Sequence, residues 1–173
     1  MPGSRRDEEF SAFVQDHRID MLRAACLLAA GDTHRAEDLV QTALARLYVA
    51  WPRVRRSGSE AAYVWRIIVN AHLDEVRRPR WWRERYVPEP PDEPGPAADD
   101  SLPGQVDGET IRAALAALPP GMRTVIVLRH WLDLSVGQTA DLMNCSEGTV
   151  KSQTAKAAAR LRGLLAASER IGK

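Results

Sequence analysis

An acidic, proline-rich segment divides this chain of 173 residues into two parts. Residues 87–109 contain six prolines, three glycines, seven acidic side chains and no basic one. Such a segment buries too little apolar surface to offset the entropy lost when its backbone is ordered, and its prolines favour extended conformations. The sequence therefore predicts two small folded domains, at residues 6–86 and 109–168, joined by a flexible linker at 87–108.

The net charge of +1 conceals a segregation of charge along the chain. Residues 1–86 hold 15 basic and 12 acidic side chains, and residues 110–173 hold nine basic and four acidic ones. Two mildly basic ends joined by an acidic segment indicate nucleic-acid contacts at both ends.

The stretch from Ser135 to Arg162 has the pattern of two short helices joined by a tight turn. Ser135 and Gln138 have the spacing of a capping box, and Ser146 can cap the second helix. The outer face of that helix is small except for its lysines, so its backbone could approach a groove floor closely. This pattern is typical of a helix-turn-helix whose second helix enters a DNA major groove. An ordinary helical hairpin with a solvated face is the alternative. The predicted buried stripe comprises Val150, Thr154, Ala157, Leu161 and Leu164.

The part before the linker predicts helices at residues 8–30, 33–51 and 59–78, because apolar residues recur there at helical spacing. We expect Gly31 to end the first helix and Asp32 to cap the second. The inner stripe of the second helix is predicted to comprise Ala36, Leu39, Val40, Ala43, Leu47 and Trp51.

Proline and glycine mark the expected breaks in this helical pattern. Residues 52–58 are predicted to form an arginine-rich loop, and Pro79 to stop the third helix. After the linker, Asp107 or Gly108 should open a helix that ends before Pro119, and residues 122–131 should form the next. Strand signals are nearly absent, so the predicted fold class is all-α.

The third predicted helix carries a row of polar side chains at spacings of three and four. Asp74 is positioned to hold Arg77 in one rotamer beside Asn70. Residues 80–86 then interleave arginines with aromatic rings, a composition suited to single-stranded nucleic acid, because cations track phosphates while rings stack on unpaired bases. Alternatively, Trp81 and Trp82 cover the end of the helical core and the arginines are merely solvated.

The second predicted helix begins with the polar cluster Glu37, Asp38 and Gln41. Acidic residues in a first helical turn are expected from the helix dipole alone, so both a structural and a binding role remain open here.

Signatures of enzymes, metal sites and membrane spans are missing from the sequence. It has no Walker A loop, no G-x-G-x-x-G, no H-E-x-x-H and no zinc-type Cys/His cluster, so we expect neither an enzyme nor a cofactor. Cys26 and Cys145 lack C-x-x-C spacing and are interpreted as small buried apolar residues or incidental thiols, rather than as a disulfide or a metal site. The histidines His17, His34, His72 and His130 are interpreted as partly exposed helix residues.

No apolar run approaches the length of a membrane span, and the N-terminus is polar. We therefore expect a cytoplasmic protein without membrane insertion.

Four motifs in order resemble those of one known family. They are residues 36–41 (AEDLVQ), residues 70–78 (N-x-x-x-D-x-x-R-R), residues 118–120 (LPP) and residues 146–152 (SEGTVKS). Together they resemble a group 4, extracytoplasmic-function (ECF) sigma factor of bacterial RNA polymerase, over about residues 8–166.

The resemblance implies a promoter-specificity subunit that binds core RNA polymerase through its β′ and β subunits and initiates transcription of a stress or developmental regulon. Its first domain would bind the β′ coiled coil and melt the −10 element, and its second would read the −35 element as duplex. The acidic linker would thread a basic channel of the polymerase. An anti-sigma factor is an expected partner, and the protein would join the nucleoid when bound to polymerase.

The resemblance also assigns residues to these surfaces. Polymerase binding would fall to Glu37, Asp38, Leu39 and Gln41. Binding of the −10 element would fall to Arg66, Asn70, Asp74, Arg77 and Arg78. Binding of the −35 element would fall to Ser146, Thr149, Lys151, Ser152, Ala155, Lys156 and Arg160. The competing hypothesis is a stand-alone helix-turn-helix regulator that binds duplex DNA without polymerase.

Overall fold

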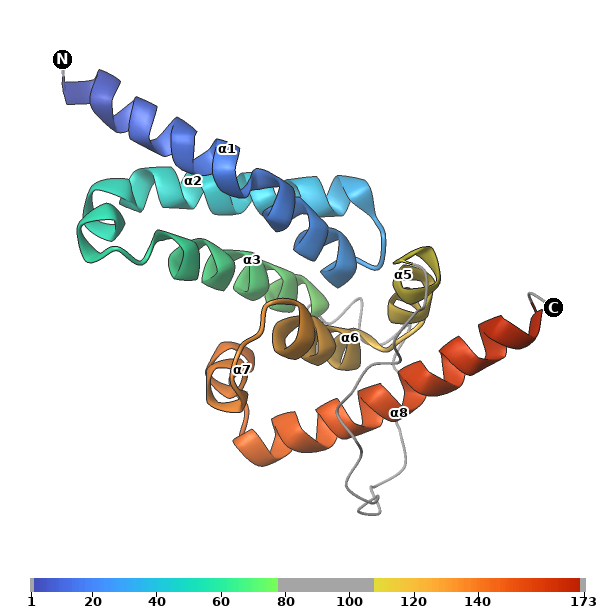
Figure 1. The fold of residues 1–173 in the computed structure, drawn as a ribbon. Coiled ribbons are helices and arrows are strands. Elements are labelled where there is room, and N and C mark those ends of the chain that lie inside the picture. Colours follow the sequence, from blue (N-terminus) through green and yellow to red (C-terminus); the bar gives the residue numbers. More distant parts are fainter. Residues whose placement is uncertain (1, 78–107, 172–173) are drawn as a thin grey trace. The chain divides into compact units, whose positions relative to one another are not determined.

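The described residues of the computed structural model, 2–77 and 108–171, form helices joined by turns, with no strand among them (Figure 1). The all-α prediction is therefore confirmed for this part of the chain. The chain separates into two compact units, residues 1–74 and 75–173. Most of the predicted linker, like Arg78 and residues 80–86, lies outside the described residues.

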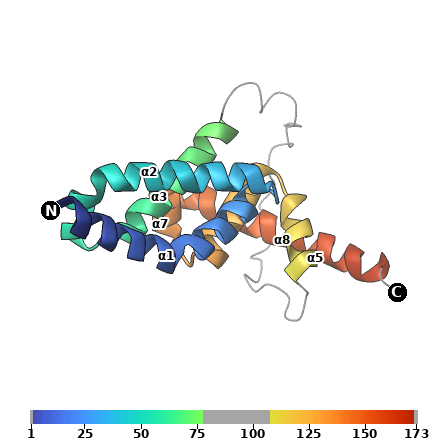
Figure 2. The same cartoon turned by 90° about the horizontal axis from the view of Figure 1, so that it is seen from above.

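The first unit is built from α1 (Pro2–Leu28), α2 (Thr33–Ser57) and α3 (Glu60–Val76). Helix α1 packs along α2, and α3 lies beside α2 (Figures 1 and 2). The inner stripe predicted for the second helix is confirmed, since all six of its residues are buried. Leu44 and Val54 extend that stripe.

The turn between α1 and α2 is closed by local hydrogen bonds. The Gly31 N–H donates to the Cys26 carbonyl at 2.9 Å, and Ala30 and Gly31 have left-handed φ angles of 57° and 85°. This is the Schellman pattern, which satisfies the last carbonyls of a helix. Asp32 then caps α2 as predicted, because its side chain accepts from the Arg35 N–H at 3.0 Å.

The loop predicted at residues 52–58 is wrong, because α2 continues through Pro52 to Ser57. Proline lacks the N–H that would bond to the Tyr48 carbonyl four residues earlier. The guanidinium of Arg6 on α1 donates to that carbonyl instead. The helix ends at Gly58, whose left-handed φ of 64° suits the residue that follows a helix.

Helix α3 is tied to α2 at both ends. Near its start, Arg55 of α2 pairs with Glu60 at 3.3 Å and also lies 3.6 Å from Glu9 of α1. Near its end, the Arg35 guanidinium donates to Nδ1 of His72 at 3.3 Å. This contact corrects the interpretation of His72 as partly exposed, since the side chain is fully buried.

The second unit begins with α5 (Gly108–Ala116), which opens where predicted, and α6 (Pro120–Ile126). Arg123 of α6 is 5% exposed and donates to the carbonyls of Ala116 and Leu118, at 3.2 and 3.1 Å. It thereby satisfies carbonyls at the end of α5. The predicted helix at 122–131 begins earlier than expected and changes at Val127 into a π-helical turn, η1 (Val127–Trp131).

The helix-turn-helix follows as α7 (Val136–Met143) and α8 (Glu147–Ile171). The predicted capping box is confirmed, with the Ser135 hydroxyl accepting from the Gln138 N–H and the Gln138 side chain accepting in return. Asn144 makes the turn with a left-handed φ of 52°. Helix α8 packs against α5, α6 and α7. The predicted stripe of α8 is buried except at Leu164, which is half-buried while its neighbour Leu165 is buried.

Candidate nucleic-acid and polymerase interfaces

The N-terminal turn of α8 presents small polar side chains held by local hydrogen bonds. The Ser146 hydroxyl accepts from the Thr149 N–H at 3.1 Å and lies 2.9 Å from the Thr149 hydroxyl. The Ser152 hydroxyl donates to the Thr149 carbonyl at 3.2 Å. Ser146, Thr149 and Ser152 are exposed, as is Lys151. The predicted cap is therefore confirmed, and the exposed helix N-terminus attracts anionic groups such as phosphates.

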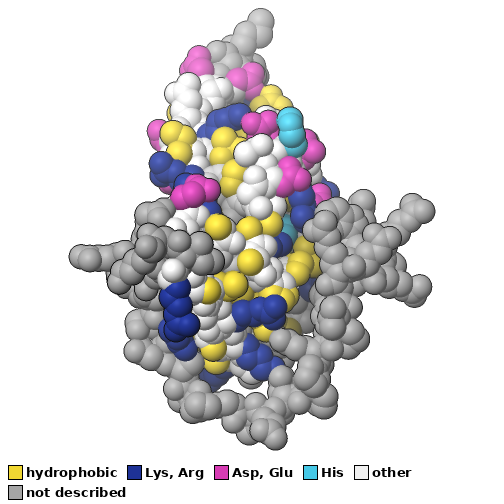
Figure 3. All heavy atoms as spheres, turned by 90° about the vertical axis from the view of Figure 1, so that its right-hand side faces the viewer, with side chains coloured by type: hydrophobic (Ala, Val, Ile, Leu, Met, Phe, Trp, Pro, Cys, Tyr) yellow, Lys and Arg dark blue, Asp and Glu magenta, His cyan; other side chains and the backbone are white. Residues whose placement is uncertain are grey.

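Further along α8, the outer face becomes flatter and cationic. Ala155 and Lys156 are half-buried, and Arg160 is exposed. In the lower half of the view in Figure 3, the charged side chains displayed among the described residues are Lys and Arg. The face therefore combines positive charge with short side chains, as close approach to a DNA groove requires.

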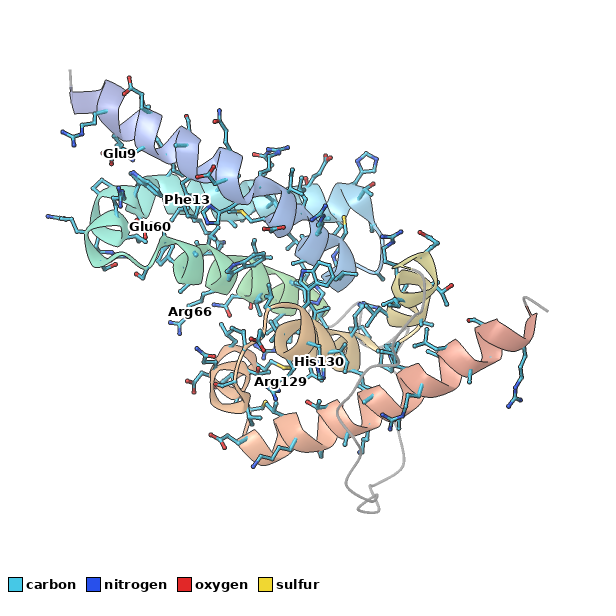
Figure 4. The ribbon with its side chains drawn as sticks, in the orientation of Figure 1. Glu9, Phe13, Glu60, Arg66, Arg129 and His130 are labelled. Atoms are coloured by element: carbon cyan, nitrogen blue, oxygen red, sulfur yellow. The ribbon has the colours of Figure 1, made fainter. Side chains whose placement is uncertain are left out.

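Helix α3 carries its predicted polar row on one exposed side. Arg66, Asn70 and Asp74 are exposed and follow one another at four-residue intervals, and Arg77 is exposed in the turn just after the helix. In Figure 4 the Arg66 side chain projects away from α1 and α2. No ion pair joins the exposed side chains of Asp74 and Arg77 in the described part of the chain, so the predicted contact is absent.

Tyr63 is a member of this α3 surface that the sequence analysis missed. It is half-buried and lies three residues before Arg66 and seven before Asn70, so helical spacing places it on the same side. The spacing was visible in the sequence, but the aromatic cluster at residues 80–86 drew the prediction instead.

On α2, the polar cluster divides by burial. Glu37, Asp38 and Gln41 are exposed, whereas Leu39 is 2% exposed and packs in the core. The assignment of Leu39 to a partner-facing role is therefore corrected. Its side chain belongs to the apolar stripe that holds α2 against its neighbours and supports the polar residues from beneath.

Tyr48 is a second residue of α2 that the sequence analysis passed over. Its hydroxyl donates to the Asp7 carboxylate at 2.7 Å, its ring centre lies 4.3 Å from the Arg6 guanidinium, and the Phe10 ring makes a T-shaped contact with it at 5.0 Å between ring centres. The hydrogen bond to Asp7 raises the pKa of Tyr48 above the ordinary value of 10.0. Because that bond needs the protonated phenol, its stabilising effect is fully present below pH 10.0 and is lost as the pH rises through the raised pKa.

Neither the cysteines nor the histidines form a reactive centre within residues 2–77 and 108–171. Cys26 and Cys145 are free and half-buried, and burial raises the pKa of Cys26 above its ordinary value. His17 makes a 2.9 Å hydrogen bond to the Phe13 carbonyl one turn earlier.

No group of three metal-ligating side chains occurs within residues 2–77 and 108–171. Every helix described there is too short or too polar to cross a bilayer.

Comparison with known proteins assigns both units. Residues 13–83 match the Sigma-70 region 2 family model, and residues 108–161 match Sigma-70 region 4. The RNA polymerase sigma-E factor of Streptomyces coelicolor is 37% identical over 163 residues, which cover 93% of this chain and 88% of that relative. The ECF sigma factor SigM of Mycobacterium tuberculosis is 30% identical, covering 88% of this chain and 74% of the relative.

The chain belongs to the ECF family of RNA polymerase sigma factors. Its function is therefore that of a transcription initiation factor that acts with RNA polymerase on promoter DNA, rather than that of a stand-alone regulator. Sigma factors are not a family of catalytic enzymes. The fold also resembles a solved sigma factor, RpoE of Bartonella quintana, with a TM-score of 0.65 and 23% identity, covering 91% of this chain and 97% of that one.

Proposed function

We propose that the exposed side of α3 binds the promoter −10 element as a single strand. The observation that carries this proposal is the row of Arg66, Asn70 and Asp74, with Tyr63 one turn earlier. An amide flanked by a cation and an aromatic ring suits a base flipped out of its stack, because the amide can bond the base edge while the ring offers a stacking surface. Arg66, Arg77 and Arg78 would meet backbone phosphates.

The outer face of α8 reads the −35 element as duplex DNA in this proposal. Lys151, Ser152 and Lys156 approach base edges or phosphates, while Ser146 and Thr149 direct the helix N-terminus at the backbone. The small side chain of Ala155 allows a close approach, and Arg160 contacts the backbone farther along.

The exposed cluster Glu37, Asp38 and Gln41 on α2 is our proposed contact with the β′ coiled coil of the polymerase. Its acidic side chains are exposed and form no ion pair within the described residues, so they are available to a basic partner surface. The protein would then act in the cytoplasm, at the nucleoid, wherever core polymerase meets promoter DNA.

The first test is co-purification with core RNA polymerase followed by run-off transcription from genomic fragments. A stoichiometric complex that produces new, salt-sensitive start sites supports this division of labour and yields the promoter sequence. Binding to duplex DNA without polymerase, and no effect on transcription start sites, would contradict it.

Asn70→Ala is expected to slow open-complex formation by about tenfold while leaving polymerase binding intact, because it removes one hydrogen-bonding partner of the flipped base. Permanganate footprinting of the melted strand measures the rate. Gln15→Ala removes an exposed amide from α1 and serves as the matched control. Loss of polymerase binding in Asn70→Ala would move the −10 surface away from α3.

Asp38→Ala is expected to weaken binding to core polymerase by roughly tenfold, because a charged interfacial hydrogen bond is lost. Titration of a fluorescently labelled chain with core enzyme gives the affinity. Asp16→Ala, which removes an exposed carboxylate from α1, should leave it unchanged. Equal affinities for the wild type and Asp38→Ala would return this cluster to a helix-dipole role.

The structural neighbour from Bartonella quintana was crystallised with the anti-sigma factor NepR. By analogy we infer that an anti-sigma factor holds this chain inactive by covering its polymerase- and DNA-binding faces. Affinity capture on the tagged chain, with polymerase competing for the same surface, tests the inference. A captured protein that leaves polymerase binding undisturbed would contradict it.

A further inference from the structure

The exposed side of α2 continues past the polar cluster to an aromatic ring. Tyr48 is 38% exposed, and Val49 beside it is 79% exposed. Tyr48 lies seven residues after Gln41 and eleven after Glu37, so helical spacing places it within about 20° of each around the axis, and all three within about 40°. The proposed polymerase-binding side of α2 thus extends, two turns farther on, into an apolar patch.

Tyr48 is exposed yet held on several sides by the first turns of α1. Its hydroxyl bonds to Asp7, its ring lies beside the Arg6 guanidinium, and the Phe10 ring meets it in a T-shaped contact. Arg6 itself is anchored, because it also donates to the Tyr48 carbonyl that Pro52 leaves without a partner. A surface side chain held this way loses little conformational freedom when a partner binds it.

The side chains that hold Tyr48 come from a segment outside the matched family region. Region 2 is matched from residue 13 onward, whereas Arg6, Asp7 and Phe10 precede it on the same continuous helix. This segment of α1 therefore lies just before the matched region. Arg6, Asp7 and Phe10 all contact one exposed side chain, Tyr48, rather than packing only into the core.

We propose that Tyr48 is an anchor residue for core RNA polymerase, and that Asp7 and Arg6 are positioning residues that hold its ring for that contact. The proposal rests on the proposed role of α2 as the polymerase-binding helix. Because the hydroxyl of Tyr48 is already bonded, the surface offered is apolar: the free part of the ring and the Val49 side chain. It fits an aliphatic side chain on the polymerase element that meets Asp38. Tyrosines with limited freedom are over-represented among residues that dominate binding energy.

The affinity of the full-length chain for core polymerase tests this directly. Tyr48→Ala is expected to weaken binding by about tenfold or more, the usual effect of truncating an aromatic anchor. Ile19→Ala is the matched control, because Ile19 is 62% exposed but lies on the side of α1 opposite Phe10, and it should bind like the wild type. Binding by Tyr48→Ala within twofold of the wild type would overturn the proposal.

A double-mutant cycle separates positioning from a general structural effect. Tyr48→Phe keeps the ring but removes its bond to Asp7. Asp7→Ala should therefore weaken polymerase binding a few-fold in the wild-type background and have no further effect in the Tyr48→Phe background. An equal loss in both backgrounds would show that Asp7 acts independently of Tyr48 and would overturn its positioning role. These two variants remove one exposed hydrogen bond, so both should remain folded, with thermal midpoints within a few degrees of the wild type.

The Asp38→Ala variant separates two possible errors: that Tyr48 is not an anchor, and that α2 is not the polymerase-binding helix. Weakened binding by Asp38→Ala together with unchanged binding by Tyr48→Ala would overturn the anchor alone. Unchanged binding by both would overturn the assignment of α2 as the polymerase-binding helix, and the anchor with it. Weakened binding by both supports one continuous surface from Asp38 to Tyr48.

Discussion

Ala30 adopts a left-handed backbone conformation, with φ at 57°, in the turn between α1 and α2. That conformation brings the Cβ of an L-residue too close to its own peptide and costs roughly 1–2 kcal/mol. Glycine normally occupies this place after a helix, and Gly31 next to it has the same handedness. The strain remains because the Schellman hydrogen bond and the Asp32 cap close the turn on both sides.

Ala30→Gly is therefore expected to stabilise the first unit by about 0.5–1 kcal/mol, since relief of strain exceeds the entropy that glycine adds to the unfolded chain. The urea concentration at the midpoint of unfolding should rise, while the slope of the free energy of unfolding against urea concentration stays unchanged. Ala29→Gly is the matched control. Ala29 is 3% exposed and its N–H still donates to Ala25 in the helical pattern, so that change should destabilise by about 1 kcal/mol. A lower midpoint for Ala30→Gly would contradict the strain argument.

At the scale of elements, α2 shows where local sequence reasoning succeeds and where it fails. Its cap at Asp32 and its buried stripe follow from residues close together in sequence, and both were predictable. Its passage through Pro52 was not, because the residue that replaces the lost N–H is Arg6 on another helix. The burial of His72 escaped prediction for the same reason, since its partner Arg35 lies on a different helix. Caps and periodicity are local, whereas these partners come from tertiary packing.

Coupling between Arg6 and Pro52 tests this account of α2. Arg6→Met should cost about 1 kcal/mol more in the wild-type background than in Pro52→Ala, where the restored N–H can bond the Tyr48 carbonyl. The free energies of unfolding of the two single variants and the double variant give the coupling. Identical costs in both backgrounds would show that Arg6 supports α2 only through its contact with the Tyr48 ring.

For the whole molecule, the division into two helical units and the helix-turn-helix were predictable from composition, capping residues and helical spacing. On α3 and α8, most of the residues predicted to bind DNA are exposed, because exposed polar rows obey the helical repeat, and their binding roles stay predictions. Tyr63 was missed because the aromatic cluster at residues 80–86 was favoured instead, and Tyr48 was missed because Asp7 and Arg6, which hold it, lie on another helix. If both proposed faces bind promoter DNA, each makes its own electrostatic contribution to the affinity.

Lys151 offers a measure of the contribution from α8. If its ammonium neutralises a phosphate, Lys151→Ala should weaken promoter binding by the polymerase complex on any −35 sequence and reduce the slope of log K against log salt by about one. Fluorescence anisotropy over a salt series gives the slope, and Arg18→Ala on the exposed surface of α1 is the control with no expected change. A loss of affinity confined to one base pair, with the slope unchanged, would instead place Lys151 against a base edge in the major groove. Either result locates the N-terminal part of α8 on the duplex, whereas no loss of affinity would remove Lys151 from the DNA-binding face.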